Sequence, residues 1–295
     1  MRLSQVAAVC EPGDAHPCED TLWAGGDLAF VMDGASAMAT PLLDAVTGDA
    51  AWFVATVTER LRHRWAESTS VTSALRDALA DTAQTWSRLT GAAPSHDPPA
   101  HDAPPPLLPH RLPSAGLALV AIEHDDLVLL RVGDCELHVV TDDGTQRVFD
   151  DPPLRRLDER ALERMAEYRD AGLSRDGALA AIRPMLIAHR DLLNDPAGYP
   201  ALSVTRLDGL VPEVRRLPAH AVRRVLLTTD GFSCSWQSYA LEEPSRWLPG
   251  AGIDARVAEV LRRLRGIEEE DRDGLRHPRF ARHDDATALV VDLTA

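Results

Sequence analysis

The stretch that decides the fold is LAFVMDG, residues 28–34. Its five leading apolar residues predict a buried strand. Asp33 follows at the point where this strand would leave the core, and Gly34 lets the backbone bend close to whatever Asp33 holds. The stretch therefore predicts a carboxylate presented at one end of a buried sheet.

The same pattern, an apolar run bounded by an acid, occurs twice more. The run VLLTTDG at 225–231 again ends in Asp-Gly, and an acid pair opens the run DDATALVV at 284–291. A single Asp-Gly after a strand is usually only a turn. Several together would place carboxylates at one sheet end, where their mutual repulsion calls for a cation. Ligation by oxygen alone favours magnesium or manganese over zinc.

The composition argues against several classes of protein. A net charge of -15 disfavours a nucleic-acid binder, because phosphate backbones need a basic face. The sequence has no Cys-x-x-Cys pair, so a zinc knuckle and a disulfide framework are both disfavoured. Reduced cytoplasmic thiols are expected at Cys10, Cys18, Cys135 and Cys234. No signal peptide is visible, and no apolar run approaches the ~20 residues of a membrane span. We expect a cytoplasmic protein with neither a nucleic-acid nor a membrane partner.

The order of the predicted elements indicates an α+β fold. Strands are expected at 3–9, 27–32, 202–204, 222–228 and 286–293, and an antiparallel meander at 115–122, 127–132, 136–141 and 146–149. Helical spacing predicts helices at 42–65, 70–89 and 255–264, and a helical insert at 154–198 that is broken near Gly172.

The clearest break in the sequence is the proline-rich segment 91–113. We expect a surface linker of polyproline character there, in preference to a metal-binding tract built on its His residues. Because no linker divides two self-sufficient cores, residues 1–295 are expected to form a single domain.

Five short motifs follow one another along nearly the whole chain. They are Glu19-Asp20, Val31-Met32-Asp33-Gly34, the segment 115–119 with Val132-Gly133-Asp134, the run LTTDG at 227–231, and Asp284-Asp285-Ala286-Thr287. None is specific alone. In this order they resemble the motifs of the metal-dependent serine/threonine protein phosphatases of the PP2C type.

The resemblance implies a four-layer α-β-β-α sandwich, in which two packed antiparallel sheets are flanked by helices and two Mn²⁺ or Mg²⁺ ions lie at one end. Asp33 would bridge the ions, with the Gly34 carbonyl on one of them, and Asp230 and Asp284 would complete the other. Asp33 and Asp230 would act through a metal-bound water that attacks phosphorus in line. The helical insert stands where the family has a variable flap.

Three more metal ligands follow from the resemblance. Glu19 and Asp20 would bind the ions directly or through water. Asp134 would hold a third ion together with an Asp four residues after Asp230, but that position is Cys234 here, which argues against a third site. Cys234 is expected to be a buried, inert thiol, with a redox-sensitive thiol as the alternative.

The phosphate-binding residue is where this chain departs most from the family. Family members carry an Arg five residues before the Asp of the acid pair, and this chain has Ala15. His16 would take over the phosphate contact, or Arg282 or His283 beside the last motif, each weighed against a plain surface side chain. Ala35 stands where eukaryotic members have a His proposed as general acid.

Three functions remain open. The intact set of acids favours a metal-dependent phosphatase of phosphoserine and phosphothreonine, with a phosphoprotein substrate and a Ser/Thr kinase or its targets as partners. Ala15 and Cys234 favour a pseudophosphatase that serves as a regulatory binding module. The third possibility is a phosphatase for a small phosphorylated metabolite, with the insert shaping a closed pocket.

Overall fold

Two antiparallel sheets packed face to face form the centre of the computed structural model, which describes residues 1–14, 17–43, 48–91 and 107–294. The first sheet has the order β1 (Arg2–Glu11), β11 (Ala286–Thr294), β10 (Val222–Thr228), β6 (Glu136–Thr141) and β7 (Gly144–Arg147). The second has the order β2 (Thr21–Gly25), β3 (Leu28–Ala35), β4 (Ser114–Glu123), β5 (Asp126–Val132) and β9 (Glu213–Pro218), and β8 (Leu202–Ser203) pairs with β4.

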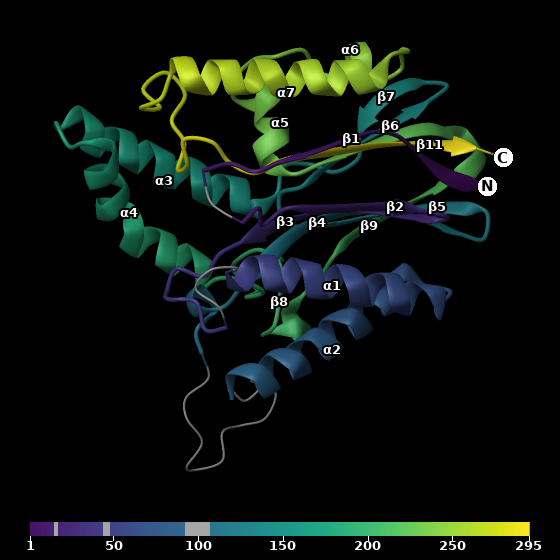
Figure 1. Ribbon diagram of the computed structural model, residues 1–295, viewed down its shortest axis with the longest axis horizontal. Coiled ribbons are helices and arrows are strands. Elements are labelled where there is room, and N and C mark those ends of the chain that lie inside the picture. The colour runs from purple at the N-terminus through teal and green to yellow at the C-terminus, as the bar shows by residue number, and fades with distance from the viewer. Residues whose placement is uncertain (15–16, 44–47, 92–106, 295) are drawn as a thin grey trace.

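Helices cover the outer face of each sheet (Figure 1). The helices α1 (Asp49–Ala66) and α2 (Val71–Thr90) lie against the second sheet, and α5 (Asp230–Gln237), α6 (Pro244–Trp247) and α7 (Ile253–Glu270) lie on the side of the first. The predicted four-layer α-β-β-α sandwich is confirmed. The helical insert consists of α3 (Pro153–Asp170) and α4 (Arg175–Arg190), which project together at one end of the sandwich.

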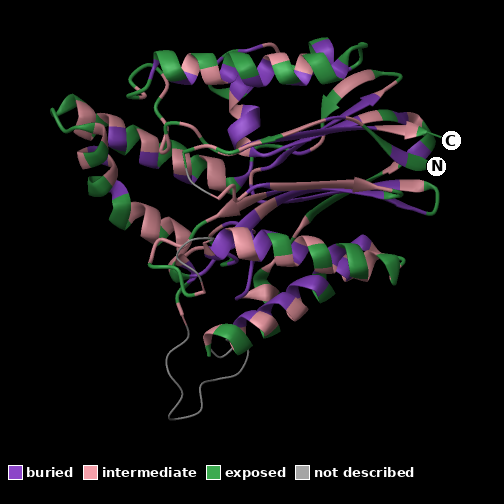
Figure 2. Ribbon diagram, in the orientation of Figure 1, coloured by how far each residue is buried: buried purple, intermediate pink, exposed green. Residues whose placement is uncertain are grey.

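Burial on both faces explains the apolar run that ends at Asp33. Along β3, Phe30 and Met32 face α1 and α2, whereas Ala29 and Val31 face the opposite sheet. Successive strand residues point to opposite faces, so a strand covered on both sides needs an unbroken apolar sequence. Figure 2 shows the buried residues concentrated in the two sheets and on the inner sides of the helices. The strand therefore presents its first acid only where it leaves the core.

The predicted meander of four strands is wrong in its pairing. The strands β4 and β5 form a hairpin in one sheet, and β6 and β7 form a hairpin in the other. The chain changes sheets at the turn after β5, where Gly133 has a φ of 76°. Glycine adopts this left-handed conformation without strain, so the turn carries the following Asp134 between the two sheets.

The helix predicted from residue 42 begins later, at Asp49. The Asp49 carboxylate accepts hydrogen bonds from the backbone N–H groups of Leu42 and Leu43, which lie in a loop before the helix. The strand predicted at 146–149 lies at Gly144–Arg147 instead. The sequence patterns missed β2, β9 and α5, and β9 is a mostly exposed strand that lacks an apolar face.

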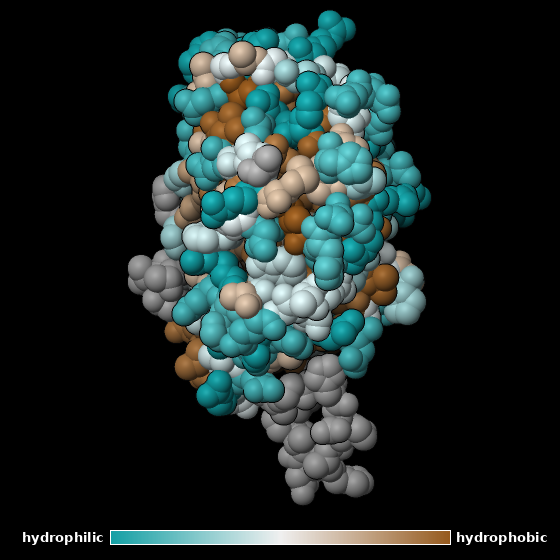
Figure 3. All heavy atoms as spheres, turned by 90° about the vertical axis from the view of Figure 1, so that its right-hand side faces the viewer, coloured by the Kyte–Doolittle hydropathy of each residue, from teal (hydrophilic) through white to brown (hydrophobic). Residues whose placement is uncertain are grey.

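The end of the proline-rich segment lies against the insert, since the backbone N–H of His110 donates to Asp191 directly after α4 at 3.1 Å. Residues 92–106 of the proline-rich segment lie outside the described residues, and its end forms a short 3-10 turn at Pro109–Arg111. The opposite end of the molecule, which faces the viewer in Figure 3, is largely hydrophilic at its surface. In the described part of the chain, no helix is long and apolar enough to cross a membrane.

Candidate active site

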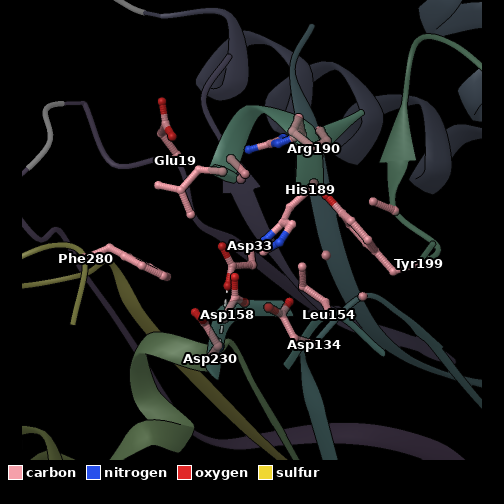
Figure 4. A pocket seen from close by; sticks show the side chains of 18 of the residues that line it. Glu19, Asp33, Asp134, Leu154, Asp158, His189, Arg190, Tyr199, Asp230 and Phe280 are labelled. Atoms are coloured by element: carbon pink, nitrogen blue, oxygen red, sulfur yellow. Dashed lines mark hydrogen bonds between the residues drawn. The ribbon is translucent and has the colours of Figure 1, made fainter. Parts of the chain in front are cut away.

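A cavity of about 360 Å³ lies where the sandwich meets the insert. Six acids contribute to its wall: Glu19, Asp33, Asp134, Asp158, Asp230 and Asp284. Figure 4 shows Asp33, Asp134, Asp158 and Asp230 close together at its centre. Three of these four, Asp33, Asp134 and Asp230, were predicted from the sequence, and they come from different strand ends of the two sheets.

Gly116 allows Asp33 and Asp134 to approach one another. It pairs with Asp33 across β3 and β4. A Cβ atom at this position would lie 3.5 Å from the Asp33 Cβ, 3.3 Å from an Asp134 carboxylate oxygen and 3.0 Å from the Cys135 sulfur. The side chains of the two acids and the thiol thus fill the space that a larger residue would need.

The second Asp-Gly motif lies at the junction of β10 and α5. Asp230 is the first residue of α5, and its backbone N–H donates to Asp33 Oδ2 at 3.4 Å. A Cβ atom on Gly231 would lie 2.0 Å from the Asp285 carbonyl oxygen. The glycine is therefore required for the close approach of the last motif, whose Asp284 lines the cavity as an exposed residue.

The acid pair at 19–20 divides into two different environments. Asp20 is 7% exposed, its Oδ2 accepts from the Thr229 hydroxyl at 2.9 Å, and its Oδ1 has no hydrogen-bond partner among the described residues. The Glu19 carboxylate instead accepts from the backbone N–H of Ser36 at 3.0 Å and from the Ser36 hydroxyl. In Figure 4 Glu19 lies apart from the central acids.

Asp285 organises the loop that carries this acid pair. Its two carboxylate oxygens accept from the backbone N–H groups of Gly13 at 2.7 Å and Glu19 at 2.6 Å. Gly34 completes the approach, because a Cβ atom there would lie 2.3 Å from the Glu19 carbonyl oxygen. The loop that carries Glu19 and Asp20 is thus in contact with both the first Asp-Gly motif and the last motif, through Gly34 and Asp285.

Burial and mutual repulsion make the central carboxyls reluctant to ionise. Burial, and then the charges of Asp230, Asp20 and Asp134, hold the pKa of Asp33 well above its ordinary value. Burial and the charge of Asp230 raise the pKa of Asp134 to about 7. Burial is also the main cause that raises the pKa of Asp20. Charge in this cluster is relieved either by protons or by cations.

The donor chemistry of the cluster fits hard divalent cations. All donors are oxygens, several have raised pKa values, and Asp20 Oδ1 is buried without a partner in the described chain. Divalent magnesium and manganese take such ligands. Among the described residues, no three acidic, His or Cys side chains converge closely enough to hold one ion as they stand. The cluster therefore fits Mg²⁺ or Mn²⁺ by the chemistry and burial of its oxygen donors, and not by a preformed geometry.

The insert contributes residues that the sequence patterns did not single out. Asp158 of α3 lines the cavity, and burial together with the charges of Asp134 and Asp230 raises its pKa to about 8. His189 and Arg190 at the end of α4 line it as well. None of them belongs to a motif, and helical periodicity alone gave no signal of their role.

Two of the predicted substitutes for the missing arginine, Arg282 and His283, do not enter the cavity wall. Ala15 and His16 lie outside the described residues. His283 Nδ1 lies 3.1 Å from Asp14 Oδ1, and the Arg282 side chain lines a separate cleft beside the turn between α3 and α4. Neither Arg282 nor His283 is among the described residues that line the cavity.

Cys234 faces the apolar core behind the site. Its thiol donates to the Gly231 carbonyl at 3.1 Å and packs against the cluster between the first sheet and α7. Burial, followed by the charge of Asp230, holds the pKa of this thiol well above its ordinary value. Cys234 is half-buried and not fully buried as expected, but these contacts favour an inert thiol and provide no replacement for a carboxylate ligand beside Asp134.

The chain is similar to known phosphatases. A family model described as protein phosphatase 2C matches residues 13–266, whereas no curated protein gives a significant match. The Mycobacterium tuberculosis serine/threonine phosphatase PstP/Ppp is 18% identical, with 100% of each chain covered and a TM-score of 0.53. Staphylococcus aureus Stp1 is 12% identical over 100% of this chain and 96% of its own, with a TM-score of 0.54.

A third similar structure is the catalytic domain of PstP in complex with two manganese ions. It is 16% identical over 100% of this chain and 99% of its own, with a TM-score of 0.51. At these identities the three structures show a shared fold. The family model gives stronger evidence than the shared fold, because it matches most of the chain. Its match spans the first Asp-Gly motif, the Gly-Asp turn and the second Asp-Gly motif.

Proposed function

The chain belongs to the protein phosphatase 2C family, and from this premise we propose that it is an active phosphatase. Its reaction is the Mn²⁺- or Mg²⁺-dependent hydrolysis of phosphoserine and phosphothreonine in a phosphoprotein. The partners are then a Ser/Thr kinase or its targets. Four free cysteines fit a reducing cytoplasm as its location. We take residues 1–295 as one phosphatase domain with the insert in place of a flap.

The observation that carries this proposal is the convergence of Asp33, Asp134 and Asp230 from separate strand ends of both sheets. A fold does not bring three partly buried like charges together for stability, since their repulsion opposes folding. Groups with strongly raised pKa values are typical of functional sites. The cost of the cluster is therefore a reason to assign it a function.

The residues that would hold the cations are the ones the motifs predict. Asp33 with the Gly34 carbonyl, Asp230 and Asp284 line the cavity and are proposed as direct ligands. Asp20 would contribute directly or through water, as would Glu19 after release from Ser36. Asp134 is the proposed ligand of a third ion, which the position of Cys234 makes the weakest of the assignments.

Bound cations at this cluster would supply an acidified water and would neutralise charge on the phosphoryl oxygens. Asp33 and Asp230 would hold these cations and so orient the attacking water, and the Asp230 N–H donates to Asp33 Oδ2 at 3.4 Å, which keeps the two residues adjacent. No nucleophilic side chain of the protein is required.

The pseudophosphatase remains the second candidate, favoured by the engagement of Glu19 with Ser36 and by Cys234. Hydrolysis of an aryl phosphate by the purified chain, with Mn²⁺ and with chelator, decides between them. We expect Mn²⁺-dependent turnover that chelator abolishes. Calorimetric binding of Mn²⁺ without turnover on the aryl phosphate or on phosphopeptides would favour the binding module instead. Preference for sugar or nucleotide phosphates over phosphopeptides would indicate a small metabolite as the substrate.

A further inference from the structure

The cavity contains one guanidinium among the side chains that the structure describes, and it belongs to the insert. We propose that Arg190 of α4 binds the phosphate group of the substrate. This inference deepens the proposed phosphatase function and rests on it for the identity of the ligand. It concerns the part of the site that the sequence left without an assigned residue, because the position expected to carry an arginine is Ala15.

The charge balance of the cavity is the first argument. Six carboxyl side chains line it, and the basic side chains among its described lining residues are His189 and Arg190. A phosphate monoester brings up to two further negative charges into this space. Arg190 offers a permanent positive charge there, and its planar fork matches the geometry of phosphate oxygens.

The second argument is the position of the guanidinium along the strands that carry Asp33. One terminal nitrogen of Arg190 donates to the Ser114 hydroxyl, and the other donates to the Ser36 carbonyl at 3.2 Å. Ser114 pairs with Ala35, two residues beyond the pairing of Asp33 with Gly116. At about 3.4 Å per residue, roughly 7 Å of strand separates the two levels. A phosphate group fits between Asp33 and Arg190 over that separation.

The third argument is that Arg190 keeps donors and charge for a ligand. The two hydrogen bonds use two of its five N–H groups. No carboxylate of the described residues lies within ion-pair distance of it, in contrast to Arg155 of α3, which pairs with Glu136 at 3.2 Å and with Asp151 at 2.6 Å. In Figure 4 Arg190 lies on one side of Asp33, and Asp134 and Asp230 lie on the other side.

A purely structural role is the alternative that an experiment must separate. Arg190 also ties α4 to the ends of β3 and β4, so its loss could loosen the insert. Arg183 of the same helix provides a matched control, because it donates to the Met38 carbonyl at 2.8 Å and does not belong to the described cavity wall. Both arginines join α4 to the loop that follows β3, but one faces the cavity.

The test is calorimetric binding of inorganic phosphate to the Mn²⁺-loaded full chain, with steady-state hydrolysis of an aryl phosphate alongside. Arg190→Ala should weaken phosphate binding about 10- to 100-fold, as the loss of a charged bidentate hydrogen bond does. KM should rise with it, while Mn²⁺ affinity stays unchanged. Arg190→Lys should recover part of the loss, because the charge returns without the fork. Arg183→Ala should bind phosphate like the wild type.

Equal phosphate binding by the wild type and Arg190→Ala would overturn the inference, as would equal losses in Arg190→Ala and Arg183→Ala. Absence of phosphate binding by the Mn²⁺-loaded wild type would overturn it as well. If Arg190→Ala does not fold, a wild-type affinity in Arg190→Lys counts against the role of the fork. A wild type that binds phosphate through Arg190 without turnover would remove the proposed catalytic function and leave this inference standing.

Discussion

The sandwich and the insert contribute to the same cavity in different ways. Asp33 lies on β3, which pairs with β4 along its whole length and with β2 up to Met32, the residue before Asp33. Arg190 lies at the end of a helix whose buried contacts with α3 are few, chiefly the small cluster of Ala161, Met165, Ala178 and Ile182. The acids of the cavity come mainly from the well-packed sandwich, and the arginine comes from the peripheral insert.

This difference follows from what each group must do. Carboxylates that repel one another stay together only if a well-packed framework holds them, because the cost of their proximity must be met by burial elsewhere. A group that contacts the substrate has no such requirement and can lie on an element with fewer contacts. We therefore expect changes in the sandwich to affect chemistry and stability, and changes in the insert to affect substrate affinity.

The largest expected effect is that of a substitution at Asp33. Asp33→Asn should lower kcat for an aryl phosphate with Mn²⁺ by roughly 10³-fold, because it removes charge from the point where the cluster converges. Calorimetry should show weaker Mn²⁺ binding in the same variant. Steady-state kinetics and calorimetry on the purified chain measure both.

Asp27 offers a control just before the same strand. Its carboxylate accepts from the Trp65 indole N–H at 2.7 Å and lies at the other end of β3. Asp27→Asn should leave kcat within about twofold of the wild type, since exposed substitutions away from a site have small effects. A similar loss of activity in both variants would mean that strand stability, and not the local charge, sets the rate.

The second expected effect concerns the junction of sandwich and insert at Glu136. The side chain of this residue is 2% exposed and accepts from His138, Arg147 and Arg155, the last of these on α3. Glu136→Gln should lower the free energy of unfolding by about 3 kcal/mol, because it removes the buried counter-charge of two arginines and leaves them only the exposed Asp151. Urea unfolding at pH 7 measures the change.

The pH dependence gives the sign of this contribution. Although burial opposes its ionisation, the hydrogen bond and charge of His138 and the charges of the two arginines lower the pKa of Glu136 to about 2. The ionised Glu136 carboxylate therefore stabilises the fold fully at pH values above the ordinary pKa of a glutamate. This stabilisation is lost as the pH falls through the lowered pKa of about 2. The wild type and Glu136→Gln should therefore converge in stability below pH 4. Exposed Glu167 of α3 is the control, with an expected change under about 0.5 kcal/mol.

How much the sequence predicts depends on the same division. The strands that carry Asp33, Asp230 and Asp284 were predictable because burial on both faces imposes a continuous apolar run, and the acid marks its end. The recurrence of this pattern predicted carboxylates at one end of a sheet, and the sandwich followed from the resemblance of the five ordered motifs to the family. Physical constraint on the core is what makes these positions visible.

The remaining features carry no comparable constraint. Sheet pairing was mispredicted at Gly133, since the same short turn can join strands of one sheet or of two. The position of Glu19 depends on a hydrogen bond to Ser36, seventeen residues away, that no local pattern records. Asp158 and Arg190 lie on amphipathic helices where any polar residue satisfies the pattern, and only the packing of α3 and α4 directs them into the cavity.

The smallest of the expected effects tests the cost of the acid cluster itself, at Asp134. Its pKa is raised to about 7 by burial and by Asp230, so the folded chain without metal binds more protons than the unfolded chain between pH 4 and pH 7. The stability of the metal-free wild type should therefore fall across this range through this residue. Asp134→Asn removes the charge and should stabilise the metal-free protein at pH 8 by about 2 kcal/mol.

The same comparison at other conditions separates charge from packing. At pH 5 the wild-type carboxyl is already protonated, and the two chains should unfold at nearly the same urea concentration, with Asp143→Asn in the exposed turn after β6 as the control at both pH values. With Mn²⁺ in place of chelator the advantage of Asp134→Asn should shrink, because cations compensate the charge that the mutation removes. A variant less stable than the wild type at pH 8 in chelator would show that Asp134 is held by favourable contacts. The sandwich would then gain stability from this member of the cluster, and the contrast between a strained acid framework and a permissive insert would not extend to the turn between the two sheets.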